Sequence, residues 1–331
     1  MSIEIRLMQA ADAPRVVDLY RAVYGDDYPV KSVYDPAAIL AAQEAGDFYR
    51  ILAFADDQLV GQSAIYRSGT PNPDLYESGQ GIVLPAYRNQ GVIEQLLRIG
   101  QDTVYPSIGI HQLWGEAVCN HVFMQKMITK LGWESTGIEI DLMPAAAYTK
   151  EKSSNGRVST VVAFKVADPE MRNVHLPAAY EELLAWLYQP LSLPRRFVRG
   201  TPSLPTDNAT AVDEQVFSDA AVARLTFTSL GSDFSNCLQS RERTAVAQGC
   251  TVLQAFLDLG DPAVGAAATT LRGQGYFLGG LLPCWYGGDG LLLQKILHTP
   301  NIEGIHLDGE RSHQILDRIL ADQATVGPSA A

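Results

Sequence analysis

The chain has 331 residues and carries 37 acidic and 25 basic side chains, which gives a formal net charge of -12. An acidic balance of this size argues against a dedicated nucleic-acid binder, which usually presents a basic face. No run approaches the roughly 18 unbroken apolar residues that span a bilayer, so we expect no membrane partner. The length predicts two domains or one large one.

Cysteine and histidine spacing indicates neither a disulfide framework nor a metal site. The four cysteines, Cys119, Cys237, Cys250 and Cys284, form no CxxC pair, and the six histidines form no HExxH pair. We therefore expect reduced thiols, a cytoplasmic protein and no bound metal. The first residues read as a strand followed by a helix, whereas a secretory signal peptide needs a basic start and an apolar block.

The first half of the chain alternates strand and helix patterns. Residues 3–9 alternate apolar and polar side chains, as a half-buried strand does, and Asp12 is a suitable N-cap for a helix at 13–24. Gly79 and Gly81 lie inside a strand pattern, which suggests a bulge or the close approach of another group. The further elements expected are helices at 36–45, 91–105 and 120–131, and strands at 49–55, 59–68, 74–84, 113–118, 133–142 and 158–168.

The second half has a similar mixture. Residues 148–157 are polar and read as a connector, and four prolines make 190–210 the best candidate for a linker. The expected helices cover 176–191, 233–248, 262–272 and 312–321, and the expected strands lie within 215–230, 251–259, 275–283 and 289–297. We therefore predict three parts: a domain at 1–147, a strand, helix and linker at 148–210, and a domain at 211–331.

One short stretch between a strand and a helix raises a question of function. From Leu84 to Leu97 the sequence LPAYRNQGVIEQLL ends an apolar run at a proline, passes an arginine and a glycine, and begins a helix. It is either an ordinary tight strand–helix turn or a seat for a phosphate group. A helix start offers unpaired N–H groups and partial positive charge, and Gly91 lets the backbone approach a ligand closely.

The order of elements and two local motifs resemble the GNAT family of N-acetyltransferases. The family pattern Arg/Gln-x-x-Gly-x-Gly/Ala follows its fourth strand, and here the segment from Arg88 to Ile93 has that place. The segment NHVFMQKMITKLGW, from Asn120 to Trp133, resembles the family's next helix, which closes with a glycine and an aromatic residue. The resemblance covers residues 3–145. It departs at Ile93, where the family usually has glycine or alanine.

The resemblance implies a ligand, acetyl-CoA or another acyl-CoA, and a set of binding residues. The turn from Arg88 through Asn89, Gln90, Gly91 and Val92 to Ile93 would hold the pyrophosphate. The backbone near Ile82, Val83 and Leu84 would pair with the pantetheine arm, and Asn120 would reach the arm from the following helix. The acyl acceptor would be an amine of a small molecule or a peptide.

Direct acyl transfer needs a base for the amine and an acid for the departing thiolate. Glu116 is the first candidate base and Glu77 the second. Glu116 is equally compatible with a solvated strand end, and for Glu77 a solvated strand position is the favoured interpretation. The tyrosine acid that the family often has in this helix is replaced by Ile128. His121, Tyr87 or Tyr105 could substitute for it, or could simply be structural. A buried structural thiol is the preferred interpretation of Cys119, over a nucleophile.

The second half lacks the phosphate-binding pattern, and we interpret it as a degenerate second GNAT-like domain. Its glycine-rich stretch is read as two strands around a tight YGGDG turn. Trp285, Tyr286 and Asp289 could line an acceptor cleft, but a purely structural hairpin is favoured.

We therefore expect a mixed α/β (α+β) tandem GNAT-like fold and transfer of an acetyl group from acetyl-CoA to an amine. Two alternatives stay open: a non-catalytic acyl-CoA or metabolite sensor, and a structural partner domain that binds no CoA.

Overall fold

The computed structural model describes residues 3–26, 28, 30–145, 154 and 156–326. The chain divides into two compact units, Met1–Gly115 and Glu116–Ala331. The division falls within strand β5 (Gln112–Val118). The boundaries expected at 147 and 210 stay predictions, and the connector expected at 148–157 lies mostly outside the described residues.

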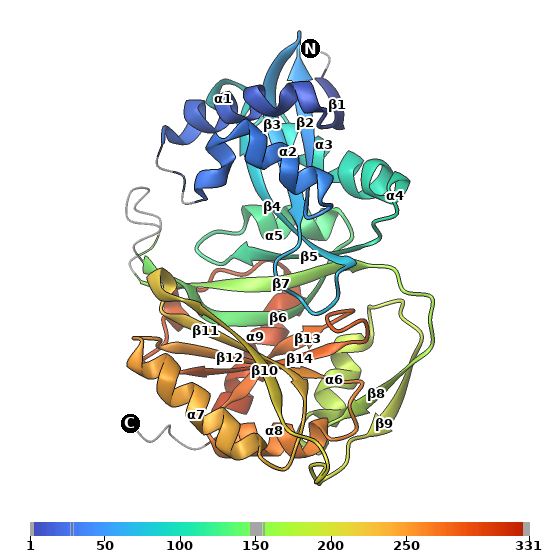
Figure 1. Cartoon of the computed structure of the whole chain (residues 1–331), viewed down its shortest axis with the longest axis vertical. Helices are drawn as coiled ribbons and strands as arrows, with labels where there is room; N and C mark the ends of the chain where they lie inside the picture. Colours follow the sequence, from blue (N-terminus) through green and yellow to red (C-terminus); the bar gives the residue numbers. More distant parts are fainter. Residues whose placement is uncertain (1–2, 27, 29, 146–153, 155, 327–331) are drawn as a thin grey trace. The chain divides into compact units, whose positions relative to one another are not determined.

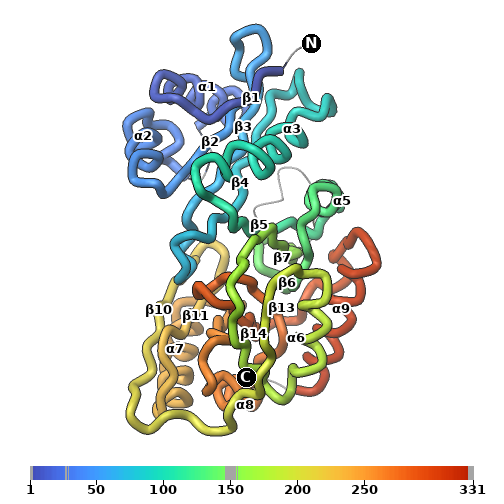
Figure 2. Tube along the Cα trace, turned by 90° about the vertical axis from the view of Figure 1, so that its right-hand side faces the viewer, coloured from blue at the N-terminus to red at the C-terminus, as the bar shows by residue number. Residues whose placement is uncertain are grey.

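The first unit is a sheet with helices on both faces. Its strands follow the order β1-β2-β3-β4-β5, antiparallel except for the parallel pair β4–β5. Helices α1 and α2 cover one face and α3 covers the other (Figures 1 and 2). The elements are β1 (Ile3–Leu7), α1 (Ala13–Tyr24), α2 (Pro36–Glu44), β2 (Phe48–Ala55), β3 (Gln58–Tyr66), β4 (Leu75–Val83), α3 (Val92–Ile99), α4 (Tyr105–Ser107) and the start of β5.

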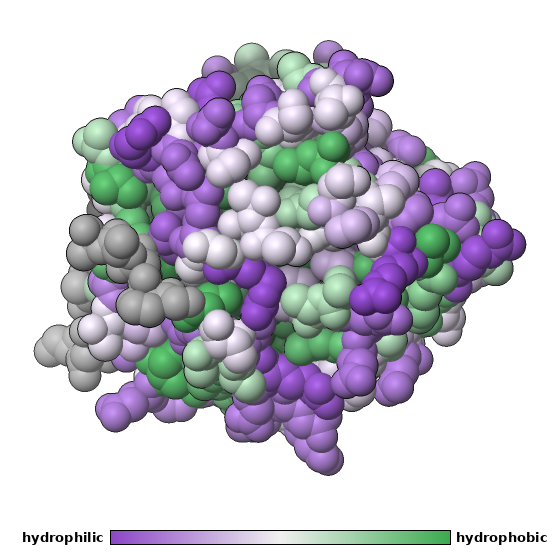
Figure 3. Space-filling model, turned by 90° about the horizontal axis from the view of Figure 1, so that it is seen from below, coloured by the Kyte–Doolittle hydropathy of each residue, from purple (hydrophilic) through white to green (hydrophobic). Residues whose placement is uncertain are grey.

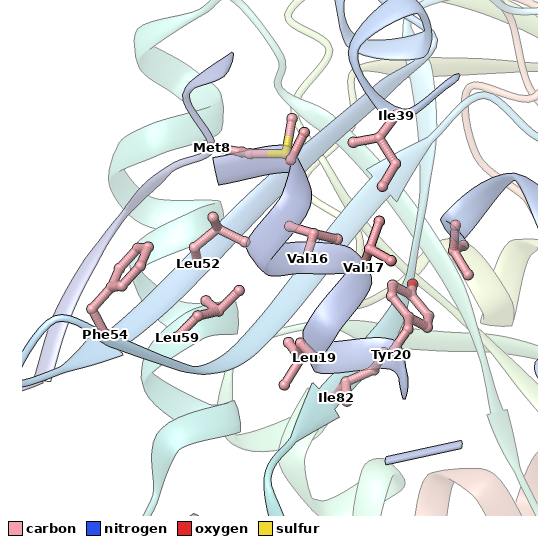
Figure 4. Packing of buried hydrophobic residues seen from close by; sticks show 12 residues of the cluster. Met8, Val16, Val17, Leu19, Tyr20, Ile39, Leu52, Phe54, Leu59 and Ile82 are labelled. Carbon is pink, nitrogen blue, oxygen red and sulfur yellow. The ribbon is translucent and has the colours of Figure 1, made fainter. Parts of the chain in front are cut away.

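A buried apolar cluster joins α1 and α2 to the sheet (Figure 4). Val16, Val17, Leu19 and Tyr20 recur on one face of α1, at the spacing that an amphipathic helix requires. Each fully buried side chain of this kind contributes about 1.5–3 kcal/mol. The cluster comprises Met8, Ala13, Val16, Val17, Leu19, Tyr20, Val33, Ile39, Leu52, Phe54, Leu59 and Ile82.

The start of α1 differs from the expected cap. The Asp12 carboxylate does not cap α1. Instead its Oδ2 accepts hydrogen bonds from Arg6 Nη1 at 2.6 Å and from the Gln9 backbone N–H at 2.8 Å. The guanidinium of Arg6 lowers the pKa of Asp12, so the carboxylate joins β1 to the helix rather than capping the helix.

Strand β4 carries the bulge that its glycines predicted. Its register with β3 shifts so that Gln80 and Gly81 lie opposite the single residue Ser63. Gln80 takes a positive φ of 51°, which accommodates the additional residue.

The second unit is also a mixed sheet between helices. Its strands follow the order β7-β6-β13-β14-β12-β11-β10, with α7 on one side and α9 on the other (Figure 2). After the end of β5 its elements are α5 (Phe123–Lys130), β6 (Glu134–Met143), β7 (Val158–Val166), β8 (Arg172–Leu176), α6 (Glu181–Tyr188), β9 (Arg195–Arg199), β10 (Ala211–Phe217), β11 (Val222–Ser229), α7 (Phe234–Ala247), β12 (Val252–Asp258), α8 (Val264–Gly273), β13 (Phe277–Leu282), β14 (Gly290–Ile296) and α9 (Gly309–Gln323).

The proline-rich stretch expected as a linker contains a strand. Strand β9 pairs in parallel with β8 to form a separate two-stranded sheet. The pairing places Arg195 beside Arg172, and the Arg195 side chain is 2% exposed. Composition did not predict this strand because its residues, RRFVR, have no alternation of apolar and polar side chains.

One succession of elements occurs twice along the chain. Strand β4, helix α3 and the parallel strand β5 are followed by α5 and the antiparallel pair β6–β7. Strand β11, helix α7 and the parallel strand β12 are followed in the same way by α8 and the antiparallel pair β13–β14. The mixed α/β fold is therefore confirmed, as is the GNAT-like order of elements in the first half.

Strands β6 and β13, which begin the two hairpins, meet at a pair of glycines. Their register pairs Gly137 with Gly280. A Cβ on Gly280 would lie 2.5 Å from the Gly137 Cα, so the two backbones touch. The buried side chain of Gln294 fills the neighbouring gap, accepting from the Ile140 backbone N–H and donating to the Ile138 and Leu278 carbonyls.

Substitution of Gly280 by alanine tests this contact. We expect Gly280→Ala to lower the free energy of unfolding by about 2–3 kcal/mol, because the added methyl group meets backbone that has no rotamer to change. Urea denaturation measures the loss. Gly273→Ala, in α8, is the control: a Cβ there meets nothing within 4 Å, so its stability should stay within about 1 kcal/mol of wild type. Equal stability of the two variants would contradict the close contact.

Candidate functional site

The turn between β4 and α3 presents an open helix start. Gly91 is the residue before α3 and takes a φ of 75°, and no side chain of the described residues caps the helix. Arg88 is exposed, and its Nε donates to the Val83 carbonyl at 3.1 Å. The other two guanidinium nitrogens of Arg88 have no partner among the described residues. Asn89, with a φ of 60°, and Gln90, which donates to the Ala86 carbonyl, complete the exposed turn.

Ile93, the departure from the family pattern, packs against β4. A Cβ on Gly81 would lie 2.9 Å from Ile93 Cδ1, so the isoleucine occupies space that a β4 side chain would need. Val92 is buried beside it. Ile93 thus turns toward the sheet, and Gly81 on the bulge accommodates it.

Strand β4 has little pairing on its β5 edge. The register runs only from Leu75↔Gln112 to Glu77↔Trp114. Ile82 and Val83 pair with β3 on the opposite edge, and the Leu84 N–H donates to the Val60 carbonyl there. Within the described residues of the first unit, no strand pairs with the β5 edge of β4 after Glu77.

Glu77 belongs to a row of side chains across three strands. Phe48, Tyr66 and Glu77 are register partners on β2, β3 and β4. The Tyr66 hydroxyl donates to Glu77 Oε1 at 2.6 Å, and the Tyr66 ring stacks on Phe48 with centroids 5.0 Å apart. The carboxylate is therefore held at a fixed position on the sheet.

Glu116, in the second unit, belongs to a polar cluster that the sequence did not predict. Arg224 Nη2, from β11, donates to Glu116 Oε1 at 2.8 Å and to Glu139 Oε1 at 3.2 Å. Gln254 donates to the same Glu139 oxygen at 2.8 Å, and Thr160 donates to the other at 2.9 Å. Two carboxylates therefore share one guanidinium in this cluster, which consists of Glu116, Thr160, Glu139, Arg224 and Gln254.

Glu139 is the most perturbed member of this cluster. Burial raises its pKa to about 8, the neighbouring Glu116 carboxylate adds to the rise, and Arg224 opposes it. A carboxyl group in this state exchanges a proton near neutral pH. No local motif marks Glu139, Arg224 or Gln254 in the sequence; the only available signal was a charged residue within each of two apolar strand patterns.

The helix after β5 begins later than expected, at Phe123 rather than at 120. Asn120 and His121 lie in the bend before it, and both are half-buried. The His121 ring lies 5.1 Å from the Phe123 ring, and its Nδ1 has no hydrogen-bond partner in the described structure. Ile128, at the position of the family's tyrosine, is buried.

The other acid and nucleophile candidates are structural in character. Burial raises the pKa of the Cys119 thiol to about 12, which keeps it protonated at neutral pH. Tyr105 is buried, and burial raises its pKa well above the usual range. Tyr87 is half-buried and donates to Gln58 Oε1 at 3.3 Å.

The glycine-rich hairpin in the second half is held by buried contacts. Asp289 accepts hydrogen bonds from Arg195 Nε at 2.6 Å, from the Tyr188 hydroxyl at 2.7 Å and from the Cys284 backbone N–H at 2.9 Å. Trp285 stacks on Phe256, and the Tyr286 hydroxyl donates to the Phe256 carbonyl. These contacts favour the structural interpretation over an acceptor cleft.

A groove of about 870 Å³ lies elsewhere in the second unit. Side chains from α7, β12 and the end of β14 line it, including Arg243, Val246, Lys295 and His298. The predicted site residues are not among them. On the face seen in Figure 3, hydrophilic side chains separate small apolar patches.

Neither a metal-ligand cluster nor a membrane-spanning helix occurs in the part of the chain that the structure describes. No group of three or more potential metal ligands is found in the described ranges. No helix among the described residues combines the length and apolar character needed to cross a bilayer.

Comparison with known proteins gives matches among solved structures alone. No family model matches the chain, and no curated protein matches it. The ribosomal-protein-S18-alanine N-acetyltransferase from Escherichia coli is 15% identical, with a TM-score of 0.39 over 51% of this chain and 97% of that chain. The ribosomal-protein-S5-alanine acetyltransferase from Vibrio fischeri is 11% identical, with a TM-score of 0.40 over 51% and 94%.

A third match is the PaiA N-acetyltransferase from Thermoplasma acidophilum in complex with coenzyme A, which is 16% identical, with a TM-score of 0.33 over 50% of this chain and 100% of that chain. Likeness at these scores carries no argument about activity. The order and pairing of the elements, described above, are what support the GNAT-like fold of the first half.

The raised pKa of Glu139 predicts a pH dependence of stability. The folded chain holds this proton above the pH at which the unfolded chain releases it, so stability falls as the pH rises from about 5 through about 8. Glu139→Gln keeps the shape and removes the titration. We expect the variant to be more stable than wild type at pH 8.5, with a smaller fall between pH 5.5 and 8.5, in urea denaturation. Glu303→Gln, at an exposed position, is the control; a wild-type slope retained in Glu139→Gln would contradict the assignment.

Proposed function

We propose that the protein is an acyl-CoA-dependent N-acyltransferase that moves an acetyl group from acetyl-CoA to an amine. The observation that carries the proposal is the edge of β4, which has no strand partner after Glu77 among the described residues. After the turn of residues 84–90, an open helix start follows at Gly91. An extended amide chain that ends in phosphates matches these two features in the same order along the backbone.

Different residues would bind the amide chain and the phosphates of such a ligand. The β4 backbone at Ile82, Val83 and Leu84 is extended and suited to pairing with amide groups. The first N–H groups of α3 and the other two guanidinium nitrogens of Arg88 supply donors for phosphate oxygens. Asn120 belongs to the second unit, and its role in binding the arm stays a prediction from the sequence. Acetyl-CoA, as co-substrate, supplies the activated acyl group.

We propose Glu77 as the general base. The Tyr66 hydroxyl fixes the Glu77 carboxylate in one position, from which it accepts a proton from the attacking amine. Glu77 lies on β4, the strand that carries the proposed acyl-CoA seat. Glu116 is kept as the second candidate; Arg224 binds its carboxylate at 2.8 Å. His121 belongs to the second unit, and its role as the acid for the thiolate stays a prediction from the sequence.

We propose that the second half is a degenerate GNAT-like domain without an acyl-CoA seat. The strand–helix turn that corresponds in order to the β4–α3 turn is the one between β11 and α7. Asp233 precedes α7 there, and its carboxylate accepts from the Thr210 N–H at 2.8 Å. A Cβ on Gly231 would lie 2.2 Å from the Asn208 carbonyl oxygen, so neighbouring backbone covers the turn. A carboxylate and a covered turn both oppose phosphate binding.

Two substitutions at Gly91 test the phosphate seat. Asparagine and aspartate tolerate a left-handed backbone and are good helix N-caps, so both variants should keep α3 and differ in one negative charge. We expect calorimetry to give a Kd for acetyl-CoA at least tenfold higher in Gly91→Asp than in Gly91→Asn, because like charges repel at the helix start. Circular dichroism checks the folding of both. Equal dissociation constants, or no binding by folded wild type, would refute the seat.

Paired glutamine substitutions test the base. We expect Glu77→Gln to lower kcat/KM by about 10²–10⁴-fold, the usual contribution of a general base. Glu116→Gln should give a smaller loss. The assay follows thiol release from acetyl-CoA with a panel of primary amines. A larger loss in Glu116→Gln would instead assign the base to β5.

A further inference from the structure

The first unit contains a buried arginine without a counter-charge. Arg50 lies on β2 and is 3% exposed. Its Nε and Nη1 are fully enclosed and have no hydrogen-bond partner, and no described residue forms an ion pair with it. Enclosing a guanidinium in this way costs several kcal/mol unless an anion and hydrogen bonds compensate for the lost water.

The immediate surroundings of Arg50 do not compensate for its charge. Its Cζ lies 4.0 Å from the centroid of the Phe48 ring, a cation–π contact that supplies no hydrogen bond and no counter-charge. Burial lowers the pKa of Arg50, and the titratable groups that oppose this shift are the phenols of Tyr20 and Tyr28. Both phenols are neutral at physiological pH because burial raises their pKa values further.

The same face of the sheet carries the proposed base. Arg50, Ala64 and Gly79 are register partners on β2, β3 and β4, and the adjoining row is Phe48, Tyr66 and Glu77. With strands about 4.8 Å apart, the Arg50 and Glu77 backbones are roughly 10–12 Å from each other. A small molecule with two polar ends can span such a distance.

A second buried atom without a partner lies on this face. Gln62, on β3, donates to the Tyr20 hydroxyl at 2.9 Å and to the Gln80 carbonyl, but its Oε1 is enclosed and accepts no hydrogen bond in the described residues. The free donors of Arg50 and the free acceptor of Gln62 are complementary to a carboxylate and to an N–H group. Both groups occur together in an amino acid.

The aromatic side chains above this face suggest the rest of the ligand. The Tyr20 ring lies 5.0 Å from that of Tyr28 and 6.4 Å from that of Tyr34, and Tyr24 adjoins Tyr28 at 5.1 Å. Such a cluster favours an apolar or aromatic body.

We propose that Arg50 binds the carboxylate of the acyl acceptor, and that the acceptor is a small carboxylate-bearing amine with an apolar body. The amine end of this inference depends on the proposed function, whereas the carboxylate end can be tested without acetyl-CoA. Arg50 is a binding and specificity-determining residue here, and Glu77 receives the proton from the amine.

Arg50→Met, which keeps the length and removes the charge, tests the proposal in two measurements. The first is the Tm of the free protein. If Arg50 serves to bind a ligand, its unpaired buried charge destabilises the ligand-free protein. The Arg50→Met variant should therefore melt at the wild-type Tm or above it. Arg98→Met, at an exposed position on α3, is the matched control. A Tm more than about 5 °C below wild type would show that Arg50 is structural, and would overturn the proposal.

The second measurement uses three related probes without acetyl-CoA: L-phenylalanine, 3-phenylpropanoate, which lacks the amine, and 2-phenylethylamine, which lacks the carboxylate. A second series of L-leucine, 4-methylpentanoate and isoamylamine varies the apolar body. We expect carboxylates of at least one series to raise the wild-type Tm, and to lose that effect in Arg50→Met. The amines should act equally on both proteins.

The outcomes separate this inference from the proposed function. Stabilisation by the carboxylates that requires Arg50 supports the inference even if acetyl-CoA does not bind. If no carboxylate of either series stabilises wild type, or if they stabilise Arg50→Met equally, the inference is overturned whatever the result with acetyl-CoA.

Discussion

The short parallel pairing of β4 with β5 is the constraint on which the first unit depends. A parallel pair needs a crossover, and the crossover here contains α3, which begins at Val92 after β4 ends at Val83. The bulge at Gln80 and Gly81 adds a residue on the opposite edge, and Ile93 packs against the glycine that the bulge provides. The open helix start, the strand edge and the packing of Ile93 are thus consequences of one local geometry.

Charge is distributed differently in the two units. In the second unit, Arg224 lies between two carboxylates that belong to strands far from it in the sequence, and hydrogen bonds from Thr160 and Gln254 complete the cluster. In the first unit, Arg50 contacts the Phe48 ring, and no carboxylate of the described residues forms an ion pair with it. Arg224 thus has its counter-charges within the chain, whereas Arg50 would receive a counter-charge from the proposed ligand.

The sequence was a good guide where a signal is local. Alternation and helical spacing predicted most elements, although not the strand β8 at Arg172–Leu176, and the glycines of β4 predicted its bulge. The predicted cap was less reliable, because Asp12 binds Arg6 instead of the N–H groups of its helix. Strand β9 was missed because its pairing with β8 is set by distant contacts such as Arg195 with Asp289.

The candidate site was predictable only in part for the same reason. The turn at Arg88–Ile93 is contiguous, so its conformation could be anticipated from its own residues. The environment of Glu116 depends on Arg224, which is 108 positions away, and no single-sequence pattern reports that distance. Arg50 gave no signal either, because its lack of a partner is a property of the folded face and not of its neighbours in sequence.

The contact of Gly137 with Gly280 limits where the polypeptide can be truncated. A shortened polypeptide that stops before β10 would uncover the edge of β6 and would remove Arg224 from Glu116 and Glu139. An uncovered strand edge invites pairing with other molecules, and Glu139, whose pKa burial already raises, would lose the cation that opposes this rise. We therefore expect a fragment that ends before β10 to aggregate when it is produced alone.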